Sequence, residues 1–73
     1  MSHLDQRLLL ELDEHPHSTA AELHAHARLG ETPLQSVRAW LRTHEGYLVI
    51  AEVVGELRWR LAPRAQEYLA ALD

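Results

Sequence analysis

The sequence predicts a mainly α-helical fold with a small β-hairpin near its C-terminal end. Its 73 residues include 14 leucines and 10 alanines but no phenylalanine, which is typical of a compact helical core. Apolar residues recur with a helical period in the first part of the chain, whereas residues 47–61 alternate with a strand period. A chain of this length has room for one domain, so we expect residues 1–73 to form a single unit.

A first helix is predicted over residues 3–14. Leucines recur one turn apart and form an inward stripe that consists of Leu4, Leu8, Leu9 and Leu12. Leu10 falls on the opposite side of this helix. Pro16 ends it, because proline lacks a backbone donor and clashes with the preceding turn.

Thr19 begins a second predicted helix, which continues to about Arg28. Thr19 and Glu22 match a capping box, in which the hydroxyl accepts from an amide of the first turn and the carboxylate reaches back. Leu23 faces inward. Gly30 suits the left-handed conformation that commonly closes a helix.

A third helix is predicted over residues 32–44. Thr32 matches an N-cap, Pro33 suits the first position, and Gln35 completes a second capping box. The apolar face of this helix consists of Leu34, Val37, Trp40 and Leu41. The other face carries Gln35, Ser36, Arg38, Ala39, Arg42 and Thr43.

Residues 47–61 are predicted to form two strands that join near Gly55. In the second strand, Arg58 and Arg60 share one face, opposite Trp59, which we expect in the core. Pro63 opens a last helix. One side of that helix is lined by Ala65, Tyr68, Leu69 and Leu72.

This order of elements resembles the winged helix-turn-helix fold of small bacterial and phage transcription regulators. The resemblance is carried by TAAEL at 19–23, LGETPLQSVRAWL at 29–41 and LRWRLAPRAQEYL at 57–69. It implies a three-helix bundle, a two-stranded wing and a C-terminal helix. It also implies that the third helix (32–44) lies in the major groove of DNA and that the hairpin (47–61) lies beside the phosphate backbone.

The resemblance and side-chain chemistry together select candidate DNA-binding residues. Arginine can bind guanine edges or phosphate, and glutamine can pair with adenine. The groove-facing residues of the third helix are Gln35, Ser36, Arg38, Ala39 and Arg42. Arg58 and Arg60 on the wing, together with Arg28, are expected to contact phosphate. For Arg58 and Arg60 an alternative stays open, in which their charge protects an edge strand and pairs with Glu52. We therefore predict a small transcriptional regulator that binds double-stranded DNA sequence-specifically.

A single domain of this size makes few DNA contacts, so we expect a homodimer. The candidate dimer surface consists of Leu9, Leu10, Ala70, Ala71 and Leu72. The chain has no cysteine and no basic, apolar start of the signal-peptide type, so a cytoplasmic location is expected.

The acidic net charge and the positions of the acidic residues leave open a second hypothesis about function. The formal net charge is −4, and charging all six histidines would move it to +2, so charge should be sensitive to pH near 6. Residues 28–64 hold six arginines and four acids between more acidic ends. The acidic first helix, with Glu52 and Glu56 near the hairpin tip, favours a winged-helix protein-interaction module, such as an adaptor, assembly domain or inhibitor, that does not bind DNA.

Metal binding and catalysis are not predicted. Two H-x-H pairs occur, at His15 and His17 and at His24 and His26, but residues two apart on a helix point about 200° apart. There is no cysteine and no HExxH motif. We expect surface histidines, no cofactor, and no enzyme activity, since no nucleophile motif or glycine-rich phosphate loop is present.

Overall fold

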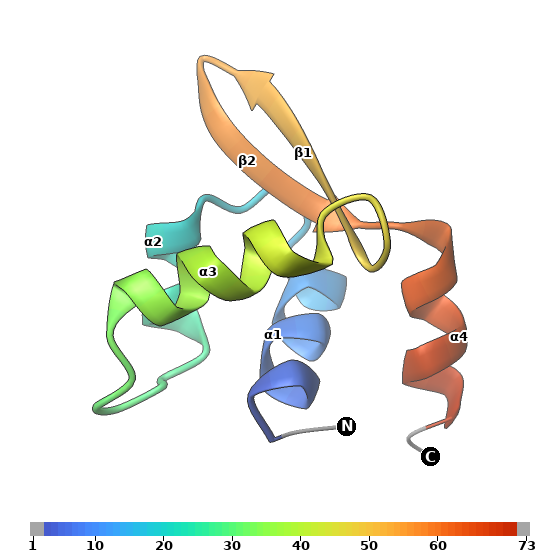
Figure 1. Ribbon diagram of the computed structural model, residues 1–73, viewed down its shortest axis with the longest axis horizontal. Helices are drawn as coiled ribbons and strands as arrows, with labels where there is room; N and C mark the ends of the chain where they lie inside the picture. Colours follow the sequence, from blue (N-terminus) through green and yellow to red (C-terminus); the bar gives the residue numbers. More distant parts are fainter. Residues whose placement is uncertain (1–2, 72–73) are drawn as a thin grey trace.

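The computed structural model describes residues 3–71, which form four helices and one β-hairpin (Figure 1). The elements in chain order are α1 (His3–Glu14), α2 (Ala20–His26), α3 (Leu34–His44), β1 (Val49–Val54), β2 (Glu56–Leu61) and α4 (Pro63–Ala71). The predicted mainly helical class with a small two-stranded antiparallel sheet is confirmed. The hairpin projects from the helical body, in which α1 lies between α2 and α4 (Figure 1).

Helices α1 and α2 begin where the sequence predicts. The capping box is present at the start of α2, where the Glu22 amide donates to Thr19 Oγ1 over 3.1 Å and the Thr19 amide donates to Glu22 Oε1 over 2.9 Å. The end of α2 comes at His26, two residues earlier than predicted. Arg28 (φ 50°) and Gly30 (φ 61°) both adopt the left-handed conformation in the turn that follows.

Helix α3 begins at Leu34, and the predicted Thr32 capping box is wrong. Pro33 occupies the N-cap position, and no side chain caps the helix. The reason is that Thr32 belongs to the turn after α2. Its amide donates to the Leu29 carbonyl over 3.1 Å, and its carbonyl oxygen lies 2.6 Å from His24 Nε2.

The hairpin is fixed to the connector between α1 and α2. Its strands are antiparallel, with Ala51 opposite Trp59, and Gly55 (φ 77°) makes the turn in the left-handed conformation that glycine tolerates best. The Ser18 amide donates to the Trp59 carbonyl over 3.1 Å, and the Trp59 amide donates to the Ser18 carbonyl over 2.8 Å. Backbone pairing therefore holds β2 against the helical body.

One hydrophobic core joins all the elements. It consists of Leu8, Leu9, Leu12, Leu23, Ala27, Val37, Trp40, Leu41, Leu48, Val49, Trp59 and Ala65. The predicted core positions of Trp40 and Trp59 are confirmed, whereas Leu57 near the hairpin tip is exposed.

Only one of the two α1 residues that were predicted for the dimer surface is exposed. Leu9 is fully buried, so its assignment to that surface is wrong. The physical reason is that α1 packs against α2, α4 and β2, which cover the face that carries Leu9. Leu10 is 49 % exposed, as expected for the far side of α1.

Helix α4 closes the fold against α1 and β2. Ala65 is buried, and the hydroxyl of Tyr68 is hydrogen-bonded to that of Tyr47, which raises the pKa of Tyr68. The guanidinium carbon of Arg64 lies 5.0 Å from the centre of the Tyr47 ring. Leu72, predicted on the inner side of α4 and in the dimer surface, lies outside the described residues.

Candidate functional site

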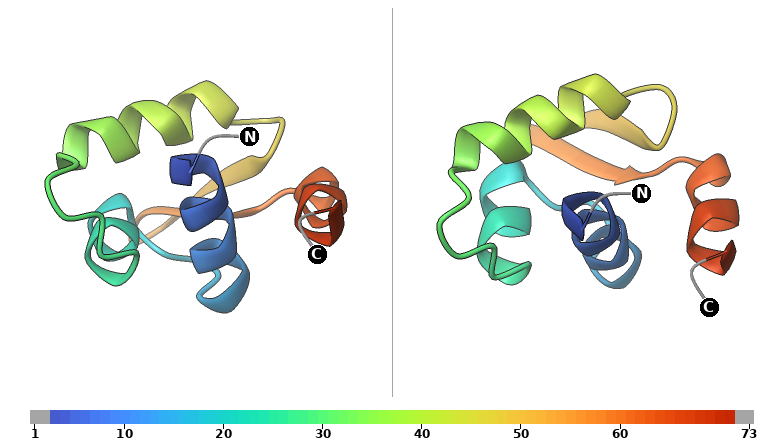
Figure 2. Two further views of the ribbon diagram at one scale, coloured as in Figure 1. Left: turned by 90° about the horizontal axis from the view of Figure 1, so that it is seen from below. Right: turned by 60° about the horizontal axis from the view of Figure 1, so that its bottom comes forward.

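The exposed face of α3 carries most of the polar residues that the sequence singled out. Gln35, Arg38, Ala39 and Arg42 are exposed, whereas Ser36 is half-buried at the edge of this face. The opposite face is buried as predicted through Val37, Trp40 and Leu41. Figure 2 shows α3 along one edge of the molecule, with α1 and α2 beneath it.

Trp40 fixes how α3 is rotated about its own axis. Its indole Nε1 donates to Asp5 Oδ1 over 2.5 Å, which ties α3 to the first turn of α1. The ring of His44 stacks on Trp40 with centroids 4.2 Å apart. Since residues on a helix follow one another at about 100°, inward anchoring of Trp40 places Arg38 and Arg42 outside.

The arginines without partners lie on the α2–turn–α3 unit. Among the residues that the structure describes, the side chains of Arg28, Arg38 and Arg42 form no hydrogen bond or ion pair. Helix α3 itself contains no acidic residue. The arginines of the hairpin are different, because both are paired with carboxylates.

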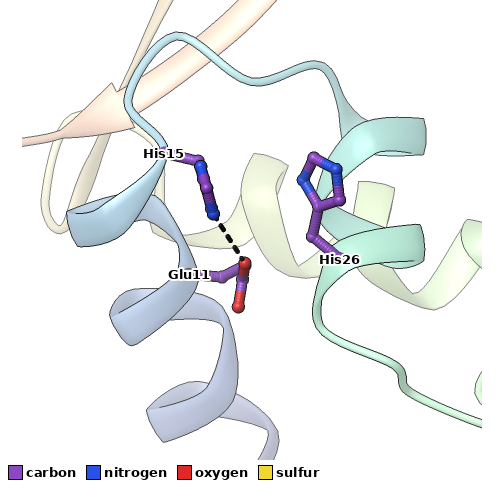
Figure 3. Close-up of side chains that lie close together, drawn as sticks. All are labelled: Glu11, His15 and His26. Carbon is purple, nitrogen blue, oxygen red and sulfur yellow. Dashed lines mark ion pairs between the residues drawn. The ribbon is translucent and has the colours of Figure 1, made fainter.

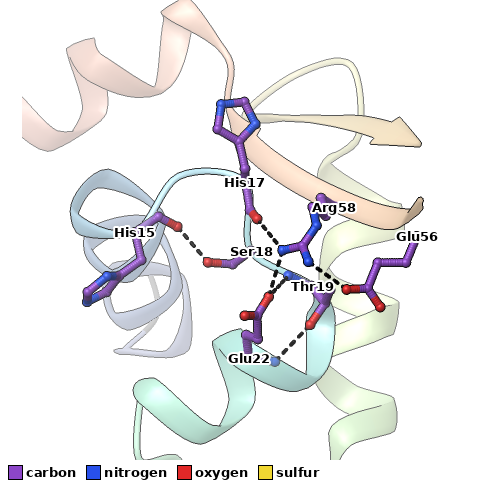
Figure 4. Close-up of polar contacts among 7 residues, drawn as sticks. All are labelled: His15, His17, Ser18, Thr19, Glu22, Glu56 and Arg58. Carbon is purple, nitrogen blue, oxygen red and sulfur yellow. Dashed lines mark hydrogen bonds and ion pairs between the residues drawn. The ribbon is translucent and has the colours of Figure 1, made fainter. Parts of the chain in front are cut away.

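Arg58 links the hairpin to the start of α2 (Figure 4). Its Nη1 donates to Glu22 Oε1 over 3.0 Å and to the His17 carbonyl over 2.9 Å, and its Nη2 donates to Glu56 Oε1 over 2.6 Å. The Thr19 amide, the Thr19 hydroxyl and the nearby Arg58 hold the pKa of Glu22 below its usual value. This predicted phosphate contact is thus engaged within the fold.

Arg60 is engaged in the same way. Its Nε donates to Glu52 Oε1, while Glu52 Oε2 lies 3.8 Å from His17 Nδ1. The hydrogen bond and charge of Arg60, with the charge of His17, lower the pKa of Glu52. The carboxylates that the sequence placed near the hairpin tip therefore partner the hairpin's own arginines.

A groove of about 610 Å³ runs between the start of α2, α3 and the hairpin. Its lining combines the two α3 arginines with apolar side chains and two carboxylates, and includes Arg38, Leu41, Arg42, Glu45, Ala51, Glu56, Leu57 and Trp59. Beyond it, the hairpin end exposes Val53 by 79 % and Val54 by 62 %. The predicted reading face thus borders an apolar surface.

Four of the six histidines, His3, His15, His17 and His26, are exposed as expected, and His24 and His44 are half-buried. His24 contacts the turn before α3, whereas His26 points toward Glu11 and His15 at the end of α1 (Figure 3). Ligand atoms of Glu11, His15 and His26 all lie within 4.8 Å of one another. Because we considered only histidines two residues apart in the sequence, we did not predict this group. Only the i, i+4 spacing of Glu11 and His15 was available as a signal.

Comparison of the chain with models of protein families, with curated proteins and with solved structures finds no match. None of the helices in residues 3–71 combines the length and apolar character needed to cross a bilayer.

Replacement of Glu22 or Glu52 by glutamine should lower the free energy of unfolding at pH 7 but not at strongly acidic pH. Each carboxyl has a folded-state pKa below the ordinary value of 4.5. Its stabilising contribution is therefore complete above that value and is lost as the pH falls through the folded-state pKa. Urea denaturation of wild type and variants at both pH values measures the difference.

Glu31→Gln provides the control, because Glu31 is an exposed carboxylate that forms no ion pair within the described residues. It should change stability little at either pH. An equal loss of stability at neutral and acidic pH in Glu22→Gln and Glu52→Gln would show that these ion pairs do not contribute through charge.

Proposed function

We propose that this protein binds double-stranded DNA sequence-specifically as a small transcriptional regulator, with α3 in the major groove. The observation that carries the proposal is the exposed pair Arg38 and Arg42, which lie one turn apart and form no hydrogen bond or ion pair within residues 3–71. The buried face of α3 holds this pair outward. A helix of this width fits the major groove, where base edges differ in their donor and acceptor patterns.

The side chains of α3 divide into roles by their chemistry. Arg38 and Arg42 bind guanine edges or adjacent phosphates, and Gln35 pairs with adenine. Ala39 lies between them and offers a methyl contact to thymine. Arg28, exposed in the turn after α2, supplies a phosphate contact.

The ion pairs of the hairpin arginines fit the second of the two roles that the sequence left open for them. Arg58 links the hairpin to Glu22 of α2, and Arg60 links β2 to Glu52 of β1, so both charges are already engaged within the fold. The order of elements and the hairpin beside α3 support a winged-helix arrangement.

A homodimer extends this proposal, because one α3 makes few contacts. Leu10 is the large exposed apolar residue of α1, and Ala70 and Ala71 are exposed at the end of α4. These residues remain the candidate surface after Leu9 is removed from it.

A second candidate function, binding of another protein, is favoured by the groove and hairpin end. Arg38 and Arg42 line the groove together with Leu41, Leu57 and Trp59, so it fits a peptide that combines acidic and apolar side chains. The exposed valines at the hairpin end extend the same apolar surface. In this case the arginines would pair with carboxylates of the partner instead of phosphates.

The double variant Arg38→Gln/Arg42→Gln should bind a mixed-sequence duplex at least about thirtyfold more weakly than wild type, since each arginine contact is worth about 1–3 kcal/mol. For wild type, the logarithm of affinity should fall with the logarithm of salt concentration with a slope of about −3. That value corresponds to three arginines at roughly 0.9 per phosphate. Fluorescence anisotropy at several salt concentrations measures both quantities.

Arg58→Gln/Arg60→Gln removes the same charge from the hairpin and is the matched control. It should reduce DNA affinity much less, once circular dichroism has shown that the variant is folded. Equal losses in the two double variants would assign binding to net charge instead of α3. No binding of wild type to any duplex at low salt, with selection of acidic peptides from a random library, would favour the second candidate.

Leu10→Glu should shift the protein from dimer to monomer, because it places a charge in the proposed apolar contact. Light scattering over a range of concentrations measures the mass of both proteins. Gln66→Glu adds a charge at an exposed position of α4 outside that surface and should leave the mass unchanged. A wild-type mass that stays monomeric throughout would contradict the dimer.

A further inference from the structure

We propose that Glu11, His15 and His26 form a binding site for a divalent transition-metal ion, with Zn²⁺ as the expected ion. Each residue contributes one ligand atom, and these atoms lie within 4.8 Å of one another. Figure 3 shows the two imidazole rings side by side, with the Glu11 carboxylate below them and nearer to His15. This site is separate from the exposed face of α3, and the proposal does not depend on DNA binding.

The three ligands come from α1, from the residue that directly follows it, and from α2. Glu11 and His15 are one turn apart, and the His15 amide donates to the Glu11 carbonyl over 2.8 Å, which continues the pattern of α1. Ser18 Oγ donates to the His15 carbonyl over 2.6 Å, so the backbone after α1 is also held. His26 is the last residue of α2.

The donor set matches Zn²⁺ chemistry. Imidazole nitrogen and carboxylate oxygen bind Zn²⁺ at about 2.0–2.2 Å, so ligand atoms across one ion lie up to about 4 Å apart. His15 and His26 have ring centroids 5.1 Å apart, and Glu11 Oε1 lies 3.6 Å from His15 Nε2. Small rotations of these side chains complete the approach, and water fills the remaining coordination positions.

The surrounding charges permit a cation. His15 directly follows α1, whose C-terminal end favours positive charge through the helix dipole. Asp13 and Glu14 add negative charge to the same end of α1. Arg7 opposes them, since it lies one turn before Glu11 and donates to the Ala27 carbonyl beside His26. A bound ion would connect the ends of α1 and α2.

Isothermal titration calorimetry of the full chain with Zn²⁺ tests the site. Wild type should bind one ion and gain several degrees in Tm, because an ion that binds only the folded state stabilises it. His15→Gln and His26→Gln should each lower Zn²⁺ affinity at least about tenfold, as even indirect changes around a metal cost that much.

His17→Gln is the matched control, since His17 belongs to the neighbouring H-x-H pair but lies outside the group. Its Zn²⁺ affinity should stay within about twofold of wild type. In wild type and in His17→Gln, Zn²⁺ should shift the imidazole nitrogen signals of His15 and His26 in NMR spectra. The proposal is overturned if wild type binds no Zn²⁺, if His17→Gln loses as much affinity as His26→Gln, or if those two imidazoles do not respond.

Discussion

The anchoring of α3 through Trp40 determines which side chains the molecule presents to solvent. Trp40 is 7 % exposed, its indole nitrogen donates to Asp5, and its neighbours Val37 and Leu41 are fully buried. A helix held this way cannot rotate without exposing apolar surface and leaving the indole donor unpaired. Core packing therefore holds Arg38 and Arg42 outward, since neither side chain forms a hydrogen bond or ion pair in the part of the chain that the structure describes.

The distribution of ion pairs explains how an acidic chain can present a basic face. The carboxylates of Glu22, Glu52 and Glu56 are matched by the two hairpin arginines. The Arg58–Glu22 pair connects the hairpin to α2, whereas the pairs with Glu56 and Glu52 lie within the hairpin. The connector before α2 is held by the hydrogen bond from Arg58 to the His17 carbonyl and by the backbone pairing of Ser18 with Trp59. The arginines of α3 have no such partners in the described part of the chain, so their charge remains available to a ligand.

Local patterns in the sequence predicted the elements well because those elements obey local rules. The leucine spacing of α1, the Thr19 capping box and the Gly55 turn all appear as expected. The predicted cap at Thr32 failed because a tertiary contact from His24 holds that residue in the preceding turn.

The predictions that failed at the site and at the dimer surface also failed because of tertiary contacts between residues far apart in the sequence. Arg58 and its partner Glu22 are 36 residues apart, so their pairing depends on how the hairpin returns to α2. Burial of Leu9 depends likewise on the packing of α4 and β2 against α1. The Glu11–His15–His26 group combines two helices, and helical spacing within either one does not reveal it.

The proposal that the outward face of α3 binds DNA is tested most directly by mapping the residues that contact a duplex. Isotope-labelled protein is titrated with a mixed-sequence duplex at low salt, and the backbone amide and arginine Nε signals are followed by NMR. We expect the largest changes in chemical shift at residues 35–43 and around Arg28, and the Nε signals of Arg38 and Arg42 should shift most. Changes confined to the hairpin end at residues 53–57, with the α3 arginine signals unmoved, would contradict the proposal.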